Sequence, residues 1–131
     1  MGEPKNSDPT KPELAILKLL WSADELTARD IHSAIERKFD WSYSTVRTVL
    51  ERMNEKGLIS KAPAGAANVY SAEVGKVALL GKMIADFSAR VMELEAPPAA
   101  ALFAESKLLD DAELAELEEV LRNADDQEAD Q

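Results

Sequence analysis

Hydrophobic and polar positions alternate with helical periodicity in three short segments of the first half of the chain. Within residues 10–21, 27–40 and 42–56, apolar side chains recur every three or four residues, which is typical of amphipathic helices with one buried face. Thr10, Thr27 and Ser42 stand where each segment begins, each with a polar residue three positions later, and this spacing predicts side-chain caps. Gly57 supplies a left-handed cap after the third segment. The pattern predicts three capped helices.

Two short strands follow the third helix. Leu58–Ser60 and Val69–Ser71 are rich in residues that favour strands, and the stretch 63–67 between them contains Pro63 and Gly65, as hairpin loops do. Three helices followed by a hairpin form a winged helix-turn-helix, in which the third helix can enter the DNA major groove and the loop can lie on the backbone. We therefore predict a mainly α fold with a winged helix-turn-helix DNA-binding domain.

A different pattern begins after Gly75. A long helix is predicted over residues 76–95, ended by Pro97 and Pro98, and a final helix opens at Asp110. Apolar residues at alternating three- and four-residue spacing indicate helices that pack along other helices, as core or as a dimer interface. These residues are Val77, Leu80, Ile84, Phe87, Val91 and Leu94 in the long helix and Leu114, Leu117 and Leu121 in the final one. We interpret this region as a helical dimerisation region.

The expected domain organisation follows from these patterns. Residues 1–9 form a disordered N-terminus, residues 10–75 the winged-helix DNA-binding domain, residues 76–123 the helical dimerisation region and residues 124–131 an acidic disordered tail.

Composition narrows the possible chemistry. The chain has 131 residues, no cysteine and a single histidine, His32, so disulfides, thiolate metal sites and histidine metal clusters are excluded. No metal or cofactor is expected, and His32 is expected to be exposed or to cap a helix. No run approaches the length of a membrane span and the start does not resemble a signal peptide, so we expect a cytoplasmic protein without membrane insertion.

No catalytic constellation is evident either. Ser42 and Ser44 lack any accompanying motif for a base and an oxyanion donor. The acidic pairs at 110–111 and 118–119 are explained by helix-terminal stabilisation and a solvated face. The sequence thus gives no support to an enzyme.

The net charge of −10 is concentrated in the second half. Residues 76–131 carry five basic and fourteen acidic side chains, whereas residues 29–61 carry seven basic and five acidic ones. The outward positions of the third helix include Tyr43, Ser44, Arg47 and Thr48, and Arg52 lies on another polar side. Arginine can read guanine, and hydroxyls can bind bases or phosphates. DNA binding is the favoured interpretation; a solvated face on a winged helix that binds protein is the alternative.

The residues of this region resemble a known family. The string 41–59, with Glu13–Leu17, Leu20–Trp21 and Thr27–Ile31 upstream, is similar to the penicillinase-repressor family of winged-helix regulators over residues 10 to about 122. The resemblance implies a homodimeric bacterial repressor that binds a palindromic DNA operator. The positions that match the recognition helix are Ser42, Thr45, Arg47, Thr48 and Arg52.

Two features of this sequence differ from the pattern of the family. Its members often carry basic residues in the wing, whereas Ala62–Asn68 has none and only Lys61 lies nearby. Copper-sensing relatives use cysteines, so thiolate copper sensing is excluded here.

The resemblance also implies a route to induction. Some members are inactivated when a sensor protease cuts near a Phe, and Leu102 and Phe103 align with that segment. Leu102 stands where the cut members carry a polar residue. A sensor protease is thus an implied partner, and cleavage in the C-terminal region an implied signal.

Overall fold

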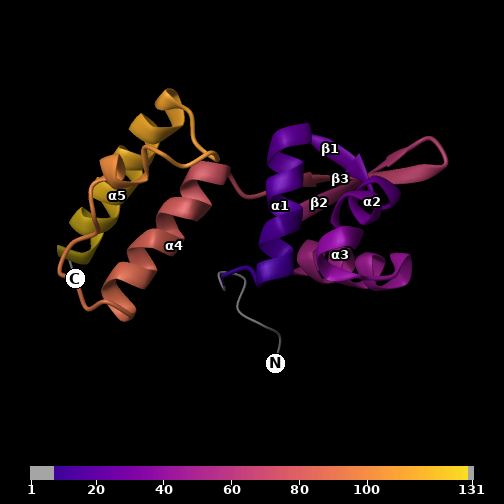
Figure 1. The fold of residues 1–131 in the computed structure, drawn as a ribbon, viewed down its shortest axis with the longest axis horizontal. Helices are drawn as coiled ribbons and strands as arrows, with labels where there is room; N and C mark the ends of the chain where they lie inside the picture. Colours follow the sequence, from indigo (N-terminus) through magenta and orange to yellow (C-terminus); the bar gives the residue numbers. More distant parts are fainter. Residues whose placement is uncertain (1–7, 130–131) are drawn as a thin grey trace. The chain divides into compact units, whose positions relative to one another are not determined.

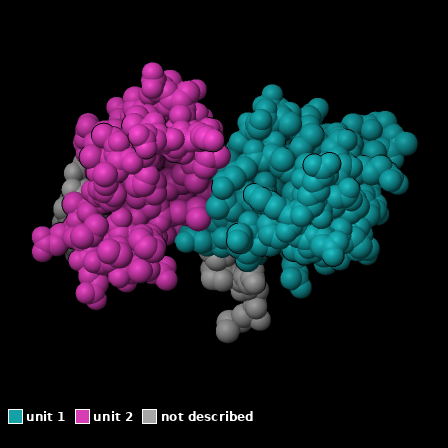
Figure 2. All heavy atoms as spheres, viewed as in Figure 1, with its two compact units in different colours: residues 1–74 teal, residues 75–131 magenta. Residues whose placement is uncertain are grey.

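The structure is a computed structural model that describes residues 8–129 of the chain, with side chains described up to residue 124. It divides into two compact units, unit 1 (Met1–Val74) and unit 2 (Gly75–Gln131), which Figure 2 shows in separate colours. No helix among the described residues is long and apolar enough to cross a membrane.

Unit 1 begins with the three helices that the sequence predicts, α1 (Lys11–Ala23), α2 (Ala28–Phe39) and α3 (Tyr43–Lys56) (Figure 1). Thr10 with Glu13 and Thr27 with Asp30 form reciprocal capping boxes, in which each side chain binds the backbone N–H of the other residue. The Ser42 hydroxyl accepts from the amide of Thr45, and Gly57 ends α3 with a φ of 82°. The expected caps are confirmed at every one of these positions.

A three-stranded antiparallel sheet completes unit 1, with β1 (Glu25–Thr27), β2 (Ile59–Ala64) and β3 (Ala67–Ala72) in the order β1-β3-β2. The predicted five-residue loop over 63–67 is wrong. Pairing continues to Ala64 opposite Ala67, and Gly65, with a φ of 65°, provides the conformation that a two-residue turn requires. The hairpin tip projects from the body of the unit (Figure 1).

Strand β1 was not expected from the sequence. Its three residues lie between two helices and are held by backbone pairing to β3, with Leu26 opposite Tyr70. So short a segment has no periodicity of its own, because its conformation is set by a partner more than forty residues away.

The core of unit 1 lies between the helices and the sheet. The buried apolar side chains among the described residues of unit 1 are Ile16, Leu17, Leu20, Ala28, Ile31, Ile35, Val46, Leu50, Met53, Leu58, Ile59 and Tyr70. On α3 helical spacing predicts an inner stripe of Val46, Val49, Leu50 and Met53, and all four are buried apart from the half-buried Val49. On α2 the same spacing predicts a buried stripe of Ile31, Ala34, Ile35 and Phe39, which is only partly correct, since Ala34 is exposed and Phe39 half-buried. These two residues border a groove that no element of unit 1 fills.

Unit 2 contains α4 (Lys76–Arg90), a short 3-10 helix η1 (Ala100–Phe103) and α5 (Asp111–Ala129). Helices α4 and α5 lie side by side and run in the same direction (Figure 1). Near their starts, Nζ of Lys76 lies 3.1 Å from Oε2 of Glu113, and further along the two helices Gly81 faces Val120. Val77, Ala100, Leu117 and Leu121 form the buried core of this unit.

The predicted end of the long helix is wrong. Helix α4 ends at Arg90 instead of Glu95, because Glu93 adopts a left-handed φ of 56° that reverses the chain. The amide of Leu94 then donates to the carbonyl of Ser88 at 2.9 Å, which satisfies a group at the helix end. Residues 91–110 return the chain so that α5 can run parallel to α4.

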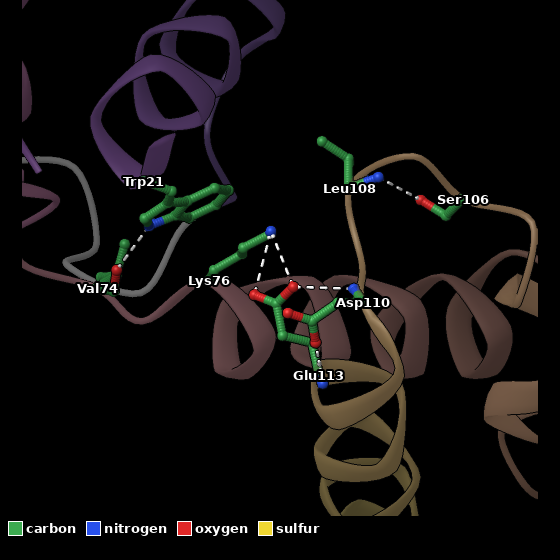
Figure 3. A network of polar contacts seen from close by, with 7 residues as sticks. All are labelled: Trp21, Val74, Lys76, Ser106, Leu108, Asp110 and Glu113. Carbon is green, nitrogen blue, oxygen red and sulfur yellow. Dashed lines mark hydrogen bonds and ion pairs between the residues drawn. The ribbon is translucent and has the colours of Figure 1, made fainter. Parts of the chain in front are cut away.

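Helix α5 begins as predicted and continues further than expected. The amide of Glu113 donates to Oδ1 of Asp110 at 2.7 Å, and the amide of Asp110 donates to Oε1 of Glu113 at 3.0 Å (Figure 3). The expected disordered tail, residues 124–131, is helical up to Ala129. Residues 130–131, and residues 1–7 of the expected disordered N-terminus, lie outside the described part of the chain.

Candidate nucleic-acid interface

The outward face of α3 is polar and accessible. Val46, Leu50 and Met53 are fully buried, and they fix the rotation of the helix about its axis. The opposite side therefore faces solvent, and it carries most of the candidate DNA-binding residues. Ser42, Ser44, Thr45, Arg47, Thr48 and Arg52 are exposed, and Tyr43 is half-buried.

Several hydroxyls of this face also bind within the helix. Oγ of Ser42 lies 3.0 Å from Oγ1 of Thr45 and accepts from the Thr45 amide at 3.1 Å. Oγ1 of Thr48 donates to the carbonyl of Ser44 at 3.1 Å. Ser42 and Thr45 thus hold the start of α3, while the Arg47 guanidinium has no hydrogen-bond or ion-pair partner among the described residues.

His32 positions the turn that leads into α3. Its Nε2 lies 2.8 Å from the carbonyl oxygen of Trp41, and since a carbonyl can only accept, Nε2 carries the hydrogen. The rings of His32 and Tyr43 form a T-shaped contact with their centroids 6.1 Å apart and an interplanar angle of 75°. The side chain is 23% exposed, so this histidine ties α2 to the start of α3 rather than lying free in solvent.

A cleft of about 340 Å³ opens where the start of α2, the start of α3 and the hairpin meet. It is lined by Thr27, Ala28, Arg29, Tyr43, Arg47, Ala66, Ala67, Asn68 and Tyr70. The guanidinium carbon of Arg29 lies 5.2 Å from the centroid of the Tyr43 ring, a cation-π arrangement. Two arginines thus face one cleft that opens beside the outward face of α3.

Arg29 and Asn68 belong to this surface although the sequence did not predict it, since Arg29 entered only through the basic charge of residues 29–61. The available signal was its place in the first turn of α2, because the start of a helix adjoining a recognition helix commonly faces the DNA backbone. Nothing in the sequence shows that the hairpin comes close to this turn.

Tyr70 forms the floor of the cleft. Burial and the nearby carboxylate of Glu51 raise the pKa of its phenol above 10.0, because both disfavour the phenolate. The floor therefore stays uncharged at neutral pH, and the positive charge of the cleft comes from its arginines.

The hairpin contributes little charge to the surface. Nζ of Lys61 lies 3.2 Å from Oε1 of Glu51 on α3, so the single lysine of the wing is already paired. No other residue between Ala62 and Ala72 is charged. The wing is thus tied to α3 by an ion pair. The exposed arginines of this surface, Arg29, Arg47 and Arg52, lie on the helices.

No metal centre accompanies this surface in the described part of the chain. Among the residues that the structure describes, no group of three or more histidine, cysteine, aspartate or glutamate side chains could hold a metal ion.

Comparison with known proteins identifies the family. The sequence model of the penicillinase repressor family matches residues 9–123. The chain belongs to the penicillinase repressor family. Membership confirms the resemblance carried by residues 41–59, and with the helices and hairpin described above it confirms the winged-helix fold. As a member of this family the chain is a transcriptional repressor.

Two individual proteins illustrate the similarity. The transcriptional regulator BlaI of Mycobacterium tuberculosis is 33% identical over 113 residues, covering 81% of this chain and 82% of that protein. A 16.5 kDa protein from Latilactobacillus sakei is 28% identical over 68 residues, or 52% of this chain. That match spans about half of the Latilactobacillus protein, 47% of its length.

One solved structure also aligns with the chain. It is the solution structure of the DNA-binding domain of the repressor BlaI, with a TM-score of 0.49 and 21% identity, covering 58% of this chain and 90% of that one.

Proposed function

We propose that the protein represses transcription by binding a palindromic operator as a homodimer, with α3 of each copy in the major groove. The observation that carries the proposal is the exposed polar face of α3, with Arg47 free of other partners and α3 held by a fully buried apolar stripe. Because the helix backbone is already ordered, binding has to order only the base-reading side chains. Arg47 and Thr48 are the proposed base-reading residues, and Arg52 and Lys61 the proposed phosphate contacts.

Charge explains why two copies are needed. Residues 1–75 carry ten basic and eleven acidic side chains, so one unit has little general attraction for phosphate. Joining two units makes the second half-site contact intramolecular, which raises the affinity through effective concentration. The acidic residues of unit 2 would be repelled by DNA, so this proposal places them away from the operator.

Unit 2 offers the surface for the second copy. The exposed large hydrophobic residues of the described chain all lie within residues 87–102: Phe87, Val91, Met92, Leu94 and Leu102. Val77, Leu117 and Leu121 are buried inside a single copy, and Ile84 and Leu114 pack against them, while Leu80 is half-buried. Of the residues expected at the dimer interface, Phe87, Val91 and Leu94 are the ones free to meet a partner. Exposed apolar clusters of this kind are typical of interaction sites.

The proposed inducing step is cleavage between Leu102 and Phe103 by a sensor protease. Leu102 is 74% exposed, whereas Phe103 packs against the core of unit 2. The segment is tied to α5 because the amide of Ala100 donates to Oε2 of Glu118 at 2.7 Å. A cut here would remove the covalent link between α4 and α5, and the weakened unit would lower dimerisation and operator affinity.

The experiment that tests the proposal is selection of binding sites from random duplex DNA, followed by mobility shift with the full chain. We expect a palindromic site whose half-sites are centred about one or two helical turns apart, bound by two copies of the chain. Shuffled DNA of the same composition is the control. Equal binding to the selected and the shuffled DNA would contradict sequence-specific operator binding. It would favour the alternative that the winged helix binds protein.

A further inference from the structure

A second concave surface of unit 1 lies between α1 and α2, on residues that the proposed DNA-binding surface does not use. This groove has a volume of about 440 Å³. Its floor is apolar and is formed by Leu14, Ala15, Leu19, Ala34, Ile35 and Phe39. Its rim carries four cations, Lys11, Lys18, Arg37 and Lys38, and no acidic residue lines it.

Helix α1 has two different faces, and only one of them is used by the core. Glu13, Ile16, Leu17 and Leu20 are buried. Positions 11, 14, 15 and 18 follow an i, i+3, i+4, i+7 pattern and line the groove, so they form one continuous stripe of about two helical turns. Leu14, Ala15, Leu19 and Phe39 are half-buried and Ala34 is exposed. The floor is therefore apolar surface that unit 1 itself leaves partly uncovered.

The four rim cations gather around the apolar floor without an acidic residue among the lining of the groove. Elsewhere in unit 1, Lys56 pairs with Glu13 and Lys61 with Glu51. None of the four rim cations forms an ion pair with any residue that the structure describes. In a chain with a net charge of −10, four unpaired cations around one apolar floor call for an occupant that is both acidic and apolar. Phosphates would meet the cations and leave the floor uncovered.

We propose that this groove binds an acidic amphipathic helix of a partner protein. Such a helix would lay leucine-like residues spaced i, i+3, i+4 and i+7 on the floor and direct glutamates to the rim, which is the helix-in-groove mode of recognition. The floor and the rim of the groove include no residue of α3, so the outward face of α3 stays uncovered.

The acidic helix of a second copy fits this role poorly. In α5 the apolar positions Leu117 and Leu121 are already buried within unit 2, and none of the large hydrophobic residues exposed in the described part of the chain lies on α5. The floor of the groove would then gain no large apolar partner. A separate protein that keeps both an apolar stripe and flanking acids free is the occupant that matches the chemistry.

The test uses the full chain and a synthetic helical peptide that has leucines at i, i+3, i+4 and i+7 and glutamates at the flanking positions. Binding is followed by fluorescence anisotropy, and its place by amide chemical-shift changes. We expect saturable binding with shifts at Ala15 and Ala34. The double variant Lys18→Glu/Lys38→Glu should weaken binding by about tenfold or more through lost attraction and new repulsion. Ala34→Glu, at an exposed floor position, should also weaken it.

Matched controls separate this outcome from general charge attraction. Lys107→Glu changes an exposed lysine of unit 2 and should leave peptide affinity unchanged. A second peptide with the same glutamates and serine in place of leucine should bind at least about tenfold more weakly, because the floor contributes only through apolar contact. Circular dichroism melts of each variant check that unit 1 stays folded.

Three results would overturn the proposal. One is equal affinity of the wild type and the charge-reversed groove variants for the leucine peptide. Another is equal affinity of the two peptides for the wild type. The third is concentration-dependent self-association that the groove variants abolish, since it would make a second copy the occupant. Operator binding is measured in parallel, so failure of the groove and failure of the DNA site are distinguishable.

Discussion

Nζ of Lys56, at the end of α3, donates hydrogen bonds to both carboxylate oxygens of Glu13, at the start of α1, at 3.2 and 3.0 Å. Oε1 of the same carboxylate also accepts from the amide of Thr10 at 2.9 Å. Glu13 is only 4% exposed. One buried carboxylate therefore caps the first helix and fixes the far end of the helix that presents the proposed DNA-reading residues.

Replacing this carboxylate should destabilise unit 1. We expect Glu13→Ala to lower the free energy of unfolding by about 2–4 kcal/mol, because it removes the cap and one partner of a largely buried ion pair. Glu13→Gln should cost less, since the amide oxygen can still accept one of these hydrogen bonds. Urea unfolding measures both. Glu55→Ala, an exposed site on α3, is the control and should stay within about 0.5 kcal/mol of the wild type; equal costs at the two sites would contradict the role of Glu13.

We expect Arg47 to let the protein distinguish its operator from other DNA sequences. Arg47→Ala should weaken binding to the selected operator by about 1–3 kcal/mol, the value of a bidentate base contact. Binding to shuffled DNA should change much less, and the exposed position of Arg47 should leave the fold intact. Mobility shift on both DNAs gives the comparison. An equal loss on both would assign Arg47 to the phosphate backbone.

Arg52 is expected to act through phosphate instead. Arg52→Ala should weaken binding to every sequence to a similar degree. The slope of log affinity against log salt should become shallower by about one unit, because one fewer counterion is released. Titrations at several salt concentrations measure this slope, with Lys107→Ala in unit 2 as the charge-matched control. An unchanged slope would show that Arg52 does not contact DNA.

Gly81 lets α4 and α5 approach closely. A Cβ at this position would collide with the side chain of Val120 and lie 3.4 Å from Cδ1 of Leu117. Gly81→Ala should therefore lower the free energy of unfolding of unit 2 by about 1–3 kcal/mol through overpacking. The higher helix propensity of alanine offsets only a part of this cost. Thermal unfolding measures the change. Val120→Ala in the same chain makes room for the new methyl, so the cost in the double variant should be smaller than the sum of the single costs; simple additivity would argue against the close approach.

The exposed apolar residues of unit 2 should hold the dimer together. Phe87→Glu/Leu94→Glu should shift the chain toward monomer and weaken operator binding, because two charges would be buried at the interface. Phe87 is 55% and Leu94 46% exposed, so the substitutions should not unfold the unit. Ala112→Glu/Ala115→Glu adds the same charge at exposed positions of α5 and should leave the dimer intact. Analytical ultracentrifugation compares them, and a stable dimer of the first variant would place the interface elsewhere.

Much of the fold could be predicted because its decisive interactions are local. The caps at Thr10, Thr27 and Ser42 join residues three positions apart, and the amphipathic stripe of α3 follows from helical spacing alone. Such contacts form within one helical turn, so they can be predicted from the residue types at that spacing. The polar outward face of α3, and with it the core of the candidate DNA site, was found by the same rule.

The parts of the fold that were not predicted depend on contacts between residues that are far apart in the sequence. Strand β1 exists because Leu26 pairs with Tyr70, the hairpin turn shortens because Ala64 pairs with Ala67, and α4 stops where Glu93 turns the chain back. Periodicity placed Val77 and Phe87 on one stripe, yet Val77 is buried and Phe87 exposed.

The sequence by itself thus determined where helices begin, which face of α3 is polar and which family the chain resembles. The tertiary structure alone decided that Arg29 and Tyr43 meet in one cleft, that Lys56 reaches Glu13, and which apolar residues remain for a partner. The physical reason is that capping and helical periodicity act over three or four residues, whereas burial depends on which surfaces the whole chain brings together.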